Sequence, residues 1–169
     1  QADGYKGYAK LYLPDTGGVP RLREAACWAH LRRDFHDFWT STKSEIACEA
    51  LDRIGKLYDI ERDINGKAAD ARYAARQKLS QPKVTAFFVW SEQQLLGILG
   101  KSDLAKAFRY GLSRRAAFSL FLTDGRVALD NNPAERALRP IGVGRNYAPQ
   151  VIMCSSRTEE HISCGAVGR

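Results

Sequence analysis

The run of residues from Asp130 to Pro140, Asp-Asn-Asn-Pro-Ala-Glu-Arg-Ala-Leu-Arg-Pro, places a carboxylate among arginines at the start of an expected helix. Asn132 can cap the first turn, Pro133 suits the first helical position, and Glu135 then falls within that turn. Metal-dependent cutting of nucleic acid needs carboxylates fixed on rigid backbone, with cations nearby that hold phosphates. The run therefore indicates Glu135 as a candidate metal ligand. An ordinary capping box, in which Glu135 bonds back to the N–H group of the cap residue, remains the alternative.

Two further blocks of the same chemical character lie in the first part of the chain. Asp3 begins the block Asp-Gly-Tyr, and Cys27 begins the block Cys-Trp-Ala-His-Leu-Arg-Arg. Followed by the Asn-Asn-Pro-Ala-Glu-Arg motif, these blocks resemble in order and type the transposases of the insertion sequence 66 family. The resemblance covers about residues 1 to 146.

The resemblance implies a DDE-type catalytic domain that cleaves and transfers DNA strands, with an α-rich α/β fold of the ribonuclease-H-like class. In that family three carboxylates hold two divalent ions, Mg²⁺ or Mn²⁺. Asp3 corresponds to the second carboxylate and Glu135 to the third, so both are expected to be catalytic residues and metal ligands. The first carboxylate and the N-terminal strands are expected upstream of the residues given. The chain is thus expected to be a fragment that binds metal weakly at most and is inactive alone.

The resemblance also implies a set of residues around the carboxylates. The expected contacts to DNA phosphates are Arg32, Arg33, Arg136, Arg139 and Arg145, and the expected supporting residues are Cys27, His30 and Asn132. A solvated helix face is the alternative for Arg32 and Arg33. For Arg139 the alternative is an i,i+4 salt bridge with Glu135.

The four cysteines do not form a disulfide framework of the secreted type. Cys27 and His30 have half the spacing of a zinc site, which Cys154, His161 and Cys164 would have to complete. No second close pair has finger-like spacing, so the sequence favours a structural role instead. Cys27 is expected to pack at a strand end, and His30 to be hydrogen-bonded near the site.

Composition favours a folded, basic protein with a polyanionic partner. Of 169 residues, 44% are hydrophobic, the net charge is +7 and the pI is near 9.4. The resemblance implies DNA at transposon ends as that partner, and self-association stays open. No apolar run reaches about 18 residues, so no membrane span is expected. The first residues lack the charged leader and apolar core of a signal peptide, and a cytoplasmic location is expected.

The elements that would position these residues are mostly helical. Residues 22–28 predict a strand that leads into a basic helix around Arg32, and apolar spacing predicts an amphipathic helix over 45–64 that Asn65-Gly66 stops. Further helices are expected over 68–79, from Pro82 to about 97–100, and from a cap at Ser102 to residue 122. A turn at 124–126 and a short extended piece at 127–129 follow. Phe87, Phe88 and Trp90 are expected in the core.

These elements suggest four segments. Residues 1–42 are expected to be part of the catalytic core, 43–123 a helical insertion, 124–146 the segment with the catalytic Glu, and 147–169 a divergent tail produced by a frameshift. Two other functions remain open: a non-catalytic basic DNA-binding module and a helical protein-interaction domain.

Overall fold

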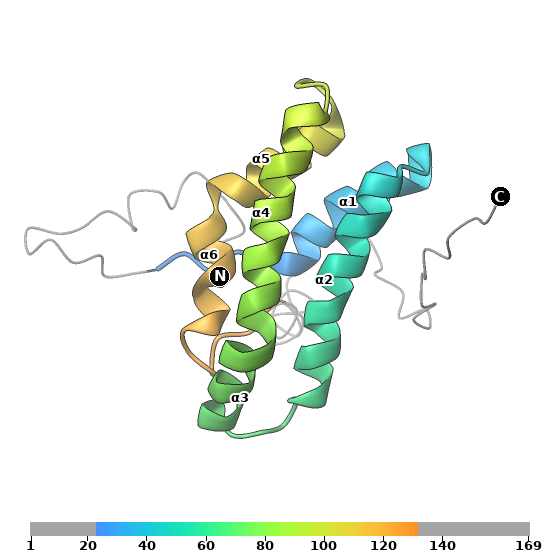
Figure 1. Cartoon of the computed structure of the whole chain (residues 1–169). Helices are drawn as coiled ribbons and strands as arrows, with labels where there is room; N and C mark the ends of the chain where they lie inside the picture. Colours follow the sequence, from blue (N-terminus) through green and yellow to red (C-terminus); the bar gives the residue numbers. More distant parts are fainter. Residues whose placement is uncertain (1–22, 132–169) are drawn as a thin grey trace, which may run out of the picture.

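Helices make up most of the chain between residues 23 and 131, the part that this computed structural model describes (Figure 1). In chain order they are α1 (Trp28–Thr42), α2 (Glu45–Asp63), α3 (Ala69–Ala75), a π-helical turn η2 (Arg76–Ser80), α4 (Gln81–Gly97), α5 (Asp103–Ser113), α6 (Arg115–Ser119) and a 3₁₀ turn η3 (Leu120–Leu122).

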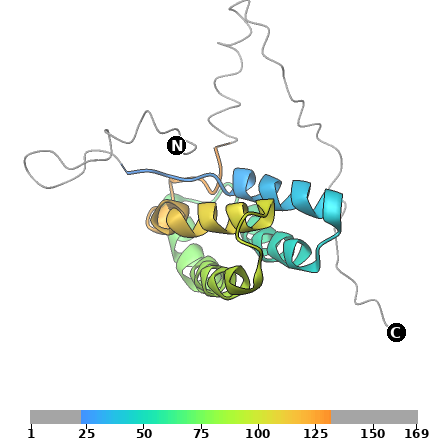
Figure 2. The same ribbon diagram turned by 90° about the horizontal axis from the view of Figure 1, so that it is seen from above.

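Four of these helices pack in a ring around one apolar core. Both α1 and α4 contact α2 on one side and α5 on the other. Seen from above, α4 lies across the core from α1 (Figure 2). The centre of the core is aromatic, with Trp28, Phe35, Phe87, Phe88, Trp90, Phe108 and Phe118. The prediction that Phe87, Phe88 and Trp90 belong to the core is confirmed, since all three are buried.

The amphipathic helix predicted over 45–64 is confirmed as α2. It begins at a true cap, because the Ser44 hydroxyl accepts a hydrogen bond from the Ala47 N–H group at 3.4 Å. Its end is followed by Gly66, whose φ of 76° lies in the left-handed region that glycine adopts without strain. The Ser102 cap of α5 is confirmed as well, with the Ala105 N–H group at 3.1 Å from the hydroxyl.

The two helices predicted at 68–79 and from Pro82 are wrong as separate elements, because α3, η2 and α4 follow one another without a break. Proline in a regular α-helix removes an N–H group and collides with the carbonyl four residues earlier. Here the turn just before it is widened: the Gln81 N–H group bonds to the carbonyl of Arg76, five residues back. The wider turn gives the Pro82 ring space inside a continuous helix.

The helix predicted to run from Ser102 to residue 122 ends earlier than expected. The chain leaves helical geometry at Arg114, which has φ −115° and ψ 22°, and α6 and η3 then complete the segment. This break redirects the chain so that Ala117, Phe118, Phe121 and Leu122 are all buried. The burial of these four side chains determines where the chain turns after Arg114. Helical periodicity alone predicted one straight helix to residue 122.

The expectation of a ribonuclease-H-like α/β fold is contradicted by the described residues, which contain no strand. The strand predicted over 22–28 is wrong within its described part, since residues 23–27 are irregular and α1 begins at Trp28. The physical reason lies in the hydrogen bonds. The Ala26 N–H group donates to the carbonyl of Ala117, on α6, at 3.2 Å, so this backbone is satisfied by a helix and not by a neighbouring strand.

A close backbone approach at Gly125 leads to a first prediction. A Cβ atom added at Gly125 would lie 1.9 Å from the carbonyl oxygen of Ala69, at the start of α3. We expect Gly125→Ala to lower the free energy of unfolding by about 1–3 kcal/mol, the usual range for overpacking. Urea unfolding followed by circular dichroism measures it.

Gly55→Ala is the matched control, because a Cβ atom there meets nothing within 4 Å and Gly55 lies inside α2. Alanine at that position should stabilise the helix by about 0.5–1 kcal/mol. Equal effects of the two substitutions would contradict the close approach at Gly125.

Candidate functional site

Two motif segments that are far apart in the sequence meet at the start of α1. The Trp28 N–H group donates to the carbonyl of Leu129 at 3.3 Å. Leu129 is buried, and Asn131, two residues later, is the last residue described. The backbone that enters the Asn-Asn-Pro-Ala-Glu-Arg motif is therefore fixed against the Cys-Trp-Ala-His block.

Trp28 anchors this junction to the core. Its side chain is fully buried, and its indole N–H group donates to the carbonyl of Phe118 at 3.0 Å. The ring packs edge-on against Phe87 and Phe118, with centroid distances of 5.4 and 5.1 Å. Because one residue contacts α4, α6 and the segment at Leu129, the start of α1 has little freedom to move.

Cys27, at the N-cap position of α1, is a buried free thiol. Burial raises the pKa of the Cys27 thiol, and Asp130 adds to the rise. N–H groups of Asn131 and His30 near the sulfur act in the opposite direction, but the thiol forms no capping hydrogen bond. Cys27 is thus a neutral packing residue and not an activated nucleophile. Cys27 is buried at a helix start and not at the strand end that was expected, and its supporting role in the site stays a prediction.

Tyr58, on α2, faces the same junction. Burial raises the pKa of the Tyr58 hydroxyl well above its ordinary value; Asp130 and Cys27 raise it further, and only Arg32 lowers it. The thiol, phenol, carboxylate and guanidinium therefore lie within electrostatic reach of one another. At ordinary pH Tyr58 keeps its proton, so it can donate a hydrogen bond toward the carboxylate but cannot act as a base.

The three α1 residues predicted for the site differ in position. His30 is half-buried on the first turn, and Arg32 and Arg33 are exposed. Successive helical residues are turned by about 100° from one another, so Arg33 does not share the direction of Arg32. The positive charge of Arg32 lowers the pKa of the Tyr58 hydroxyl, so Arg32 is the arginine of this pair whose charge affects the junction.

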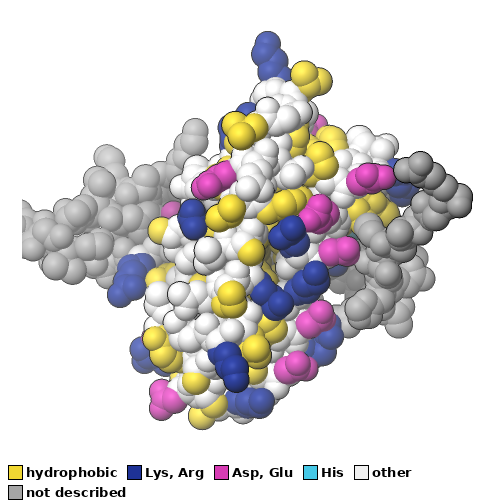
Figure 3. Space-filling model, viewed as in Figure 1, with side chains coloured by type: hydrophobic (Ala, Val, Ile, Leu, Met, Phe, Trp, Pro, Cys, Tyr) yellow, Lys and Arg dark blue, Asp and Glu magenta, His cyan; other side chains and the backbone are white. Residues whose placement is uncertain are grey.

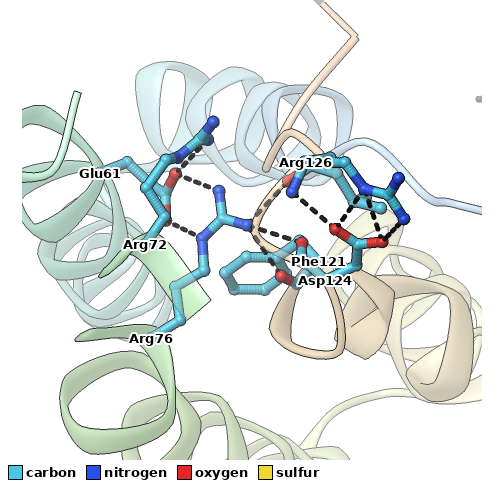
Figure 4. A network of polar contacts seen from close by, with 7 residues as sticks. Glu61, Arg72, Arg76, Phe121, Asp124 and Arg126 are labelled. Carbon is cyan, nitrogen blue, oxygen red and sulfur yellow. Dashed lines mark hydrogen bonds and ion pairs between the residues drawn. The ribbon is translucent and has the colours of Figure 1, made fainter. Parts of the chain in front are cut away.

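A buried arginine fixes the segment that leads to the junction (Figure 4). Arg76, in the π-helical turn, is fully buried and forms two charge-assisted hydrogen bonds to Glu61 of α2, at 2.7 and 2.6 Å. Its remaining terminal nitrogen donates to the carbonyls of Phe121, Asp124 and Val127, at 2.9, 3.1 and 2.8 Å. One side chain thus joins α2, η2 and the backbone of 121–127, directly before Leu129.

The turn predicted at 124–126 is confirmed, and an ion pair closes it. The Asp124 carboxylate accepts hydrogen bonds from the Arg126 backbone N–H group at 2.8 Å and from its guanidinium at 2.6 Å (Figure 4). These hydrogen bonds from Arg126 lower the pKa of the Asp124 carboxyl to about 2. Asp124 is therefore ionised at every ordinary pH. The extended piece expected at 127–129 is not a strand.

Most of the expected site residues, including both expected catalytic carboxylates, fall outside the part of the chain that the structure describes. These residues are Asp3, Asn132, Glu135, Arg136, Arg139 and Arg145. Between residues 23 and 131 there is no group of three or more His, Cys, Asp or Glu side chains that could hold a metal ion. The expected magnesium ligands and the expected tail at 147–169 therefore stay predictions.

Sequence reasoning missed Tyr58, Asp130 and the pair of Glu61 with Arg76 as residues that shape the site. Tyr58 lies within the helix predicted over 45–64, whose spacing gives it no role of its own, and Asp130 is only the first residue of a motif. Arg76 lies in a stretch rich in Ala, Arg and Lys, which offers no local signal for burial. Its partners lie 15 to 51 residues away in the chain, so only tertiary structure reveals them.

Comparison with known families agrees with these motifs. A family model described as "Transposase IS66 family" matches residues 1–153 of the chain. The chain belongs to the IS66 transposase family. Membership indicates a transposase-related function.

Three relatives of this IS66 family chain come from Sinorhizobium fredii (strain NBRC 101917 / NGR234), and all are described as uncharacterized. Protein y4qI is 40% identical over 147 residues, y4hP 38% over 157 residues and y4jD 35% over 147 residues, each covering 86% of the chain. The chain spans only 27 to 29% of the relatives' lengths. No solved structure matches the chain. Within residues 23–131, no helix is both long and apolar enough to cross a membrane.

Proposed function

We propose that this IS66 family chain takes part in DNA transposition and that Asp3 and Glu135 supply two carboxylates of a DDE-type site for DNA strand cleavage and transfer. Family membership supports the class of reaction. The assignment of the two carboxylates rests on the Asp-Gly-Tyr block and on the Asn-Asn-Pro-Ala-Glu-Arg motif.

The hydrogen bond between Trp28 and Leu129 is the observation that most supports this proposal. This hydrogen bond holds the backbone just before the Asn-Asn-Pro-Ala-Glu-Arg motif beside the Cys-Trp-Ala-His block. Two motifs that share one site need such proximity. Glu135 follows Asn131 by four residues, and four extended residues reach at most about 14 Å. This short link is compatible with the proposal that Glu135 belongs to a site at the start of α1.

A divalent metal is proposed because the chain belongs to this transposase family. The described residues themselves contain no group of side chains that could hold a metal ion. Mg²⁺ or Mn²⁺, when bound, would activate the attacking oxygen and stabilise the leaving oxygen of a phosphodiester. Asp3 and Glu135 are the proposed ligands, and weak binding is expected because Mg²⁺ keeps several waters when it has few protein ligands. The described residues support the proposed site by fixing backbone. Trp28 and Arg76 hold the segment that precedes Glu135 in the sequence.

Arginines are the proposed contacts to DNA phosphates. Arg32 and Arg33 are both exposed on α1, and the charge of Arg32 affects Tyr58 at the junction. Arg136, Arg139 and Arg145 follow the motif in the sequence and are proposed for the same role. A cation beside the carboxylates would balance the charge of the DNA strand that the site must accept.

The proposed segments 1–42 and 43–123 fold together where they are described. α1 belongs to the first segment, and it packs on α2 and α5 of the second. We propose that the helical insertion serves as the support for the catalytic segments, with 124–146 delivering Glu135. The backbone of 121–127, fixed by Arg76, is the link between them.

Titration of Mg²⁺ and Mn²⁺ into the purified chain with branched DNA tests the proposal. Wild type is compared with Asp3→Ala/Glu135→Ala, and DNA binding and nicking are both measured. We expect metal-dependent DNA binding whose apparent metal affinity falls by more than about tenfold in the double variant, the lower end for disturbing a metal site. Asp103→Ala is the control, because Asp103 is an exposed carboxylate of α5 that pairs with Lys106.

Equal metal dependence in wild type and the double variant would leave Glu135 as a helix cap and remove the proposal. DNA binding that falls steeply with salt and ignores metal would favour the non-catalytic basic DNA-binding module instead.

A further inference from the structure

The Tyr58 hydroxyl is a buried hydrogen-bond donor whose presence packing does not explain. Tyr58 lies on α2, and its ring packs against the core. The hydroxyl oxygen is inaccessible to solvent and has no hydrogen-bond partner among residues 23–131. Phenylalanine would keep the ring contacts without this donor, and a buried donor that lacks a partner destabilises a fold. An unsatisfied buried group of this kind therefore requires another explanation, such as a function.

Tyr58 differs in position from the charged residues of the same helix. Figure 3 shows acidic and basic side chains gathered over the outer face of α2. Tyr58 instead faces the start of α1, where the Trp28 N–H group donates to the carbonyl of Leu129. Asp130 follows Leu129 directly and is the first residue of the Asp-Asn-Asn-Pro-Ala-Glu-Arg segment. The unsatisfied hydroxyl therefore lies where this segment begins.

The Asp130 carboxylate lies close to the Tyr58 hydroxyl but not in full bonding geometry. Burial raises the pKa of the Tyr58 hydroxyl, and Asp130 adds to the rise both through its charge and as a hydrogen-bond acceptor. The contribution as an acceptor requires the two groups to be near each other. No hydrogen bond of ordinary length and angle joins them, however. A small shift of Asp130 would complete a bond of the strong, charge-assisted kind.

A bond that forms only in the ligand-bound state strengthens ligand binding, whereas a bond that is equally present without ligand does not. The Tyr58–Asp130 bond is incomplete in the ligand-free chain. Glu135, the proposed metal ligand, follows Asp130 by five residues in the sequence. Metal and DNA held by this segment would restrain Asp130 as well, and the restrained carboxylate could then meet the hydroxyl.

We propose that Tyr58 is a positioning residue of the DDE-type site: its hydroxyl donates a hydrogen bond to the Asp130 carboxylate once metal and DNA are bound, and this bond fixes the start of the Asp-Asn-Asn-Pro-Ala-Glu-Arg segment. The inference rests on the proposed function, because it assigns a residue to the same site. Tyr58 acts through Asp130 and not through contact with metal or DNA.

A role as the attacking nucleophile does not suit Tyr58. A nucleophilic hydroxyl needs a lowered pKa or an adjacent base. Burial raises the pKa of the Tyr58 hydroxyl, and the charge of Asp130 raises it further. A carboxylate is also too weak a base to deprotonate a phenol at ordinary pH. The hydroxyl therefore serves as a donor.

Tyr58→Phe is the first test, because it removes the hydroxyl and keeps the ring. We expect the Mn²⁺ concentration for half-maximal binding of branched DNA to rise by about threefold to tenfold, the effect of losing one hydrogen bond of ordinary strength. Tyr73→Phe is the matched control, because Tyr73 lies on α3 and is 44% exposed. An equal effect of the two substitutions would overturn the inference.

Unfolding and amide hydrogen exchange separate positioning from a purely structural role. Because the hydroxyl has no partner in the ligand-free chain, Tyr58→Phe should leave the urea midpoint unchanged or raise it. A lower midpoint would show that the hydroxyl stabilises the ligand-free fold and would overturn the inference. Exchange at residues 129–131 should slow when Mn²⁺ and DNA are added to wild type, and should slow less in Tyr58→Phe. Equal slowing would likewise overturn it.

Asp130→Ala tests whether Tyr58 acts through Asp130. In a chain that carries Asp130→Ala, the further change Tyr58→Phe should cause no additional loss of metal-dependent DNA binding. Independent, additive losses would overturn the inference. Metal dependence that Asp3→Ala/Glu135→Ala abolishes but Tyr58→Phe leaves intact would overturn the role of Tyr58 alone. A wild type without metal dependence would remove the proposed function and this inference together.

Discussion

Replacing Arg76 with methionine should lower the free energy of unfolding by about 3–5 kcal/mol, the range for removing one member of a buried ion pair. The substitution leaves the Glu61 carboxylate, 14% exposed, without its principal partner. It also removes the donor from the carbonyls of Phe121, Asp124 and Val127. A buried acceptor without a partner is destabilising in itself. Urea unfolding followed by circular dichroism measures the loss.

Lys106→Ala is the control for Arg76→Met. Lys106 and Asp103 also form an ion pair, at 2.7 Å, but their side chains are 66% and 80% exposed. An exposed pair contributes about 0–1 kcal/mol, so a small change is expected. A small change in both variants would contradict the structural importance of the buried pair.

A second variant separates the two functions of Arg76. Glu61→Leu/Arg76→Met replaces the whole ion pair by apolar side chains, which is often neutral when only a pair is lost. Here we expect incomplete recovery, because the three carbonyls still lack their donor. Full recovery of wild-type stability would show that the bonds to the backbone of 121–127 contribute little.

Trp28→Ala should lower the free energy of unfolding by about 3–5 kcal/mol, as for other buried tryptophans. The indole ring is fully buried between Phe87 and Phe118, so alanine leaves a cavity in the centre of the core. It also leaves the Phe118 carbonyl without the indole N–H group. Thermal and urea unfolding both measure this effect.

Trp28→Phe distinguishes packing from hydrogen bonding at the same position. Phenylalanine keeps most of the ring contacts but has no N–H group for the Phe118 carbonyl. The loss should therefore be smaller, about 1–3 kcal/mol for the unsatisfied acceptor together with the smaller ring. If Phe and Ala were equally destabilising, the ring contacts would not be the main contribution of Trp28.

The sequence predicted elements whose signals are local. α2 was found from its three- and four-residue apolar spacing, and the Ser44 and Gly66 ends agree with ordinary capping chemistry. The Ser102 cap and the turn at 124–126 were likewise predicted. In each case the stabilising partner lies within about one helical turn, so neighbouring residues contain the necessary information.

The errors share one cause, which is competition from distant contacts. Residues 23–27 have no strand partner in the described part of the chain, and the carbonyls of Ala117 and Leu129 take the N–H groups of Ala26 and Trp28. Pro82 suggested a helix start, but a π-helical turn carries the helix through it. That turn also contains Arg76, which is buried against α2 and the backbone of 121–127. Local sequence propensities give no sign of this burial.

The sequence alone determined the family, the helices with strong periodicity and the residue types available for chemistry. Motifs and capping signals depend only on residues close together in the sequence, so they can be recognised without knowledge of the tertiary structure. Tertiary structure alone decided that the Cys-Trp-Ala-His block meets the segment before the Asn-Asn-Pro-Ala-Glu-Arg motif, and that Arg76 fixes this approach. The hydrogen bonds responsible join groups that lie far apart in the sequence. Their strength depends on burial, and no local sequence pattern specifies which groups become buried.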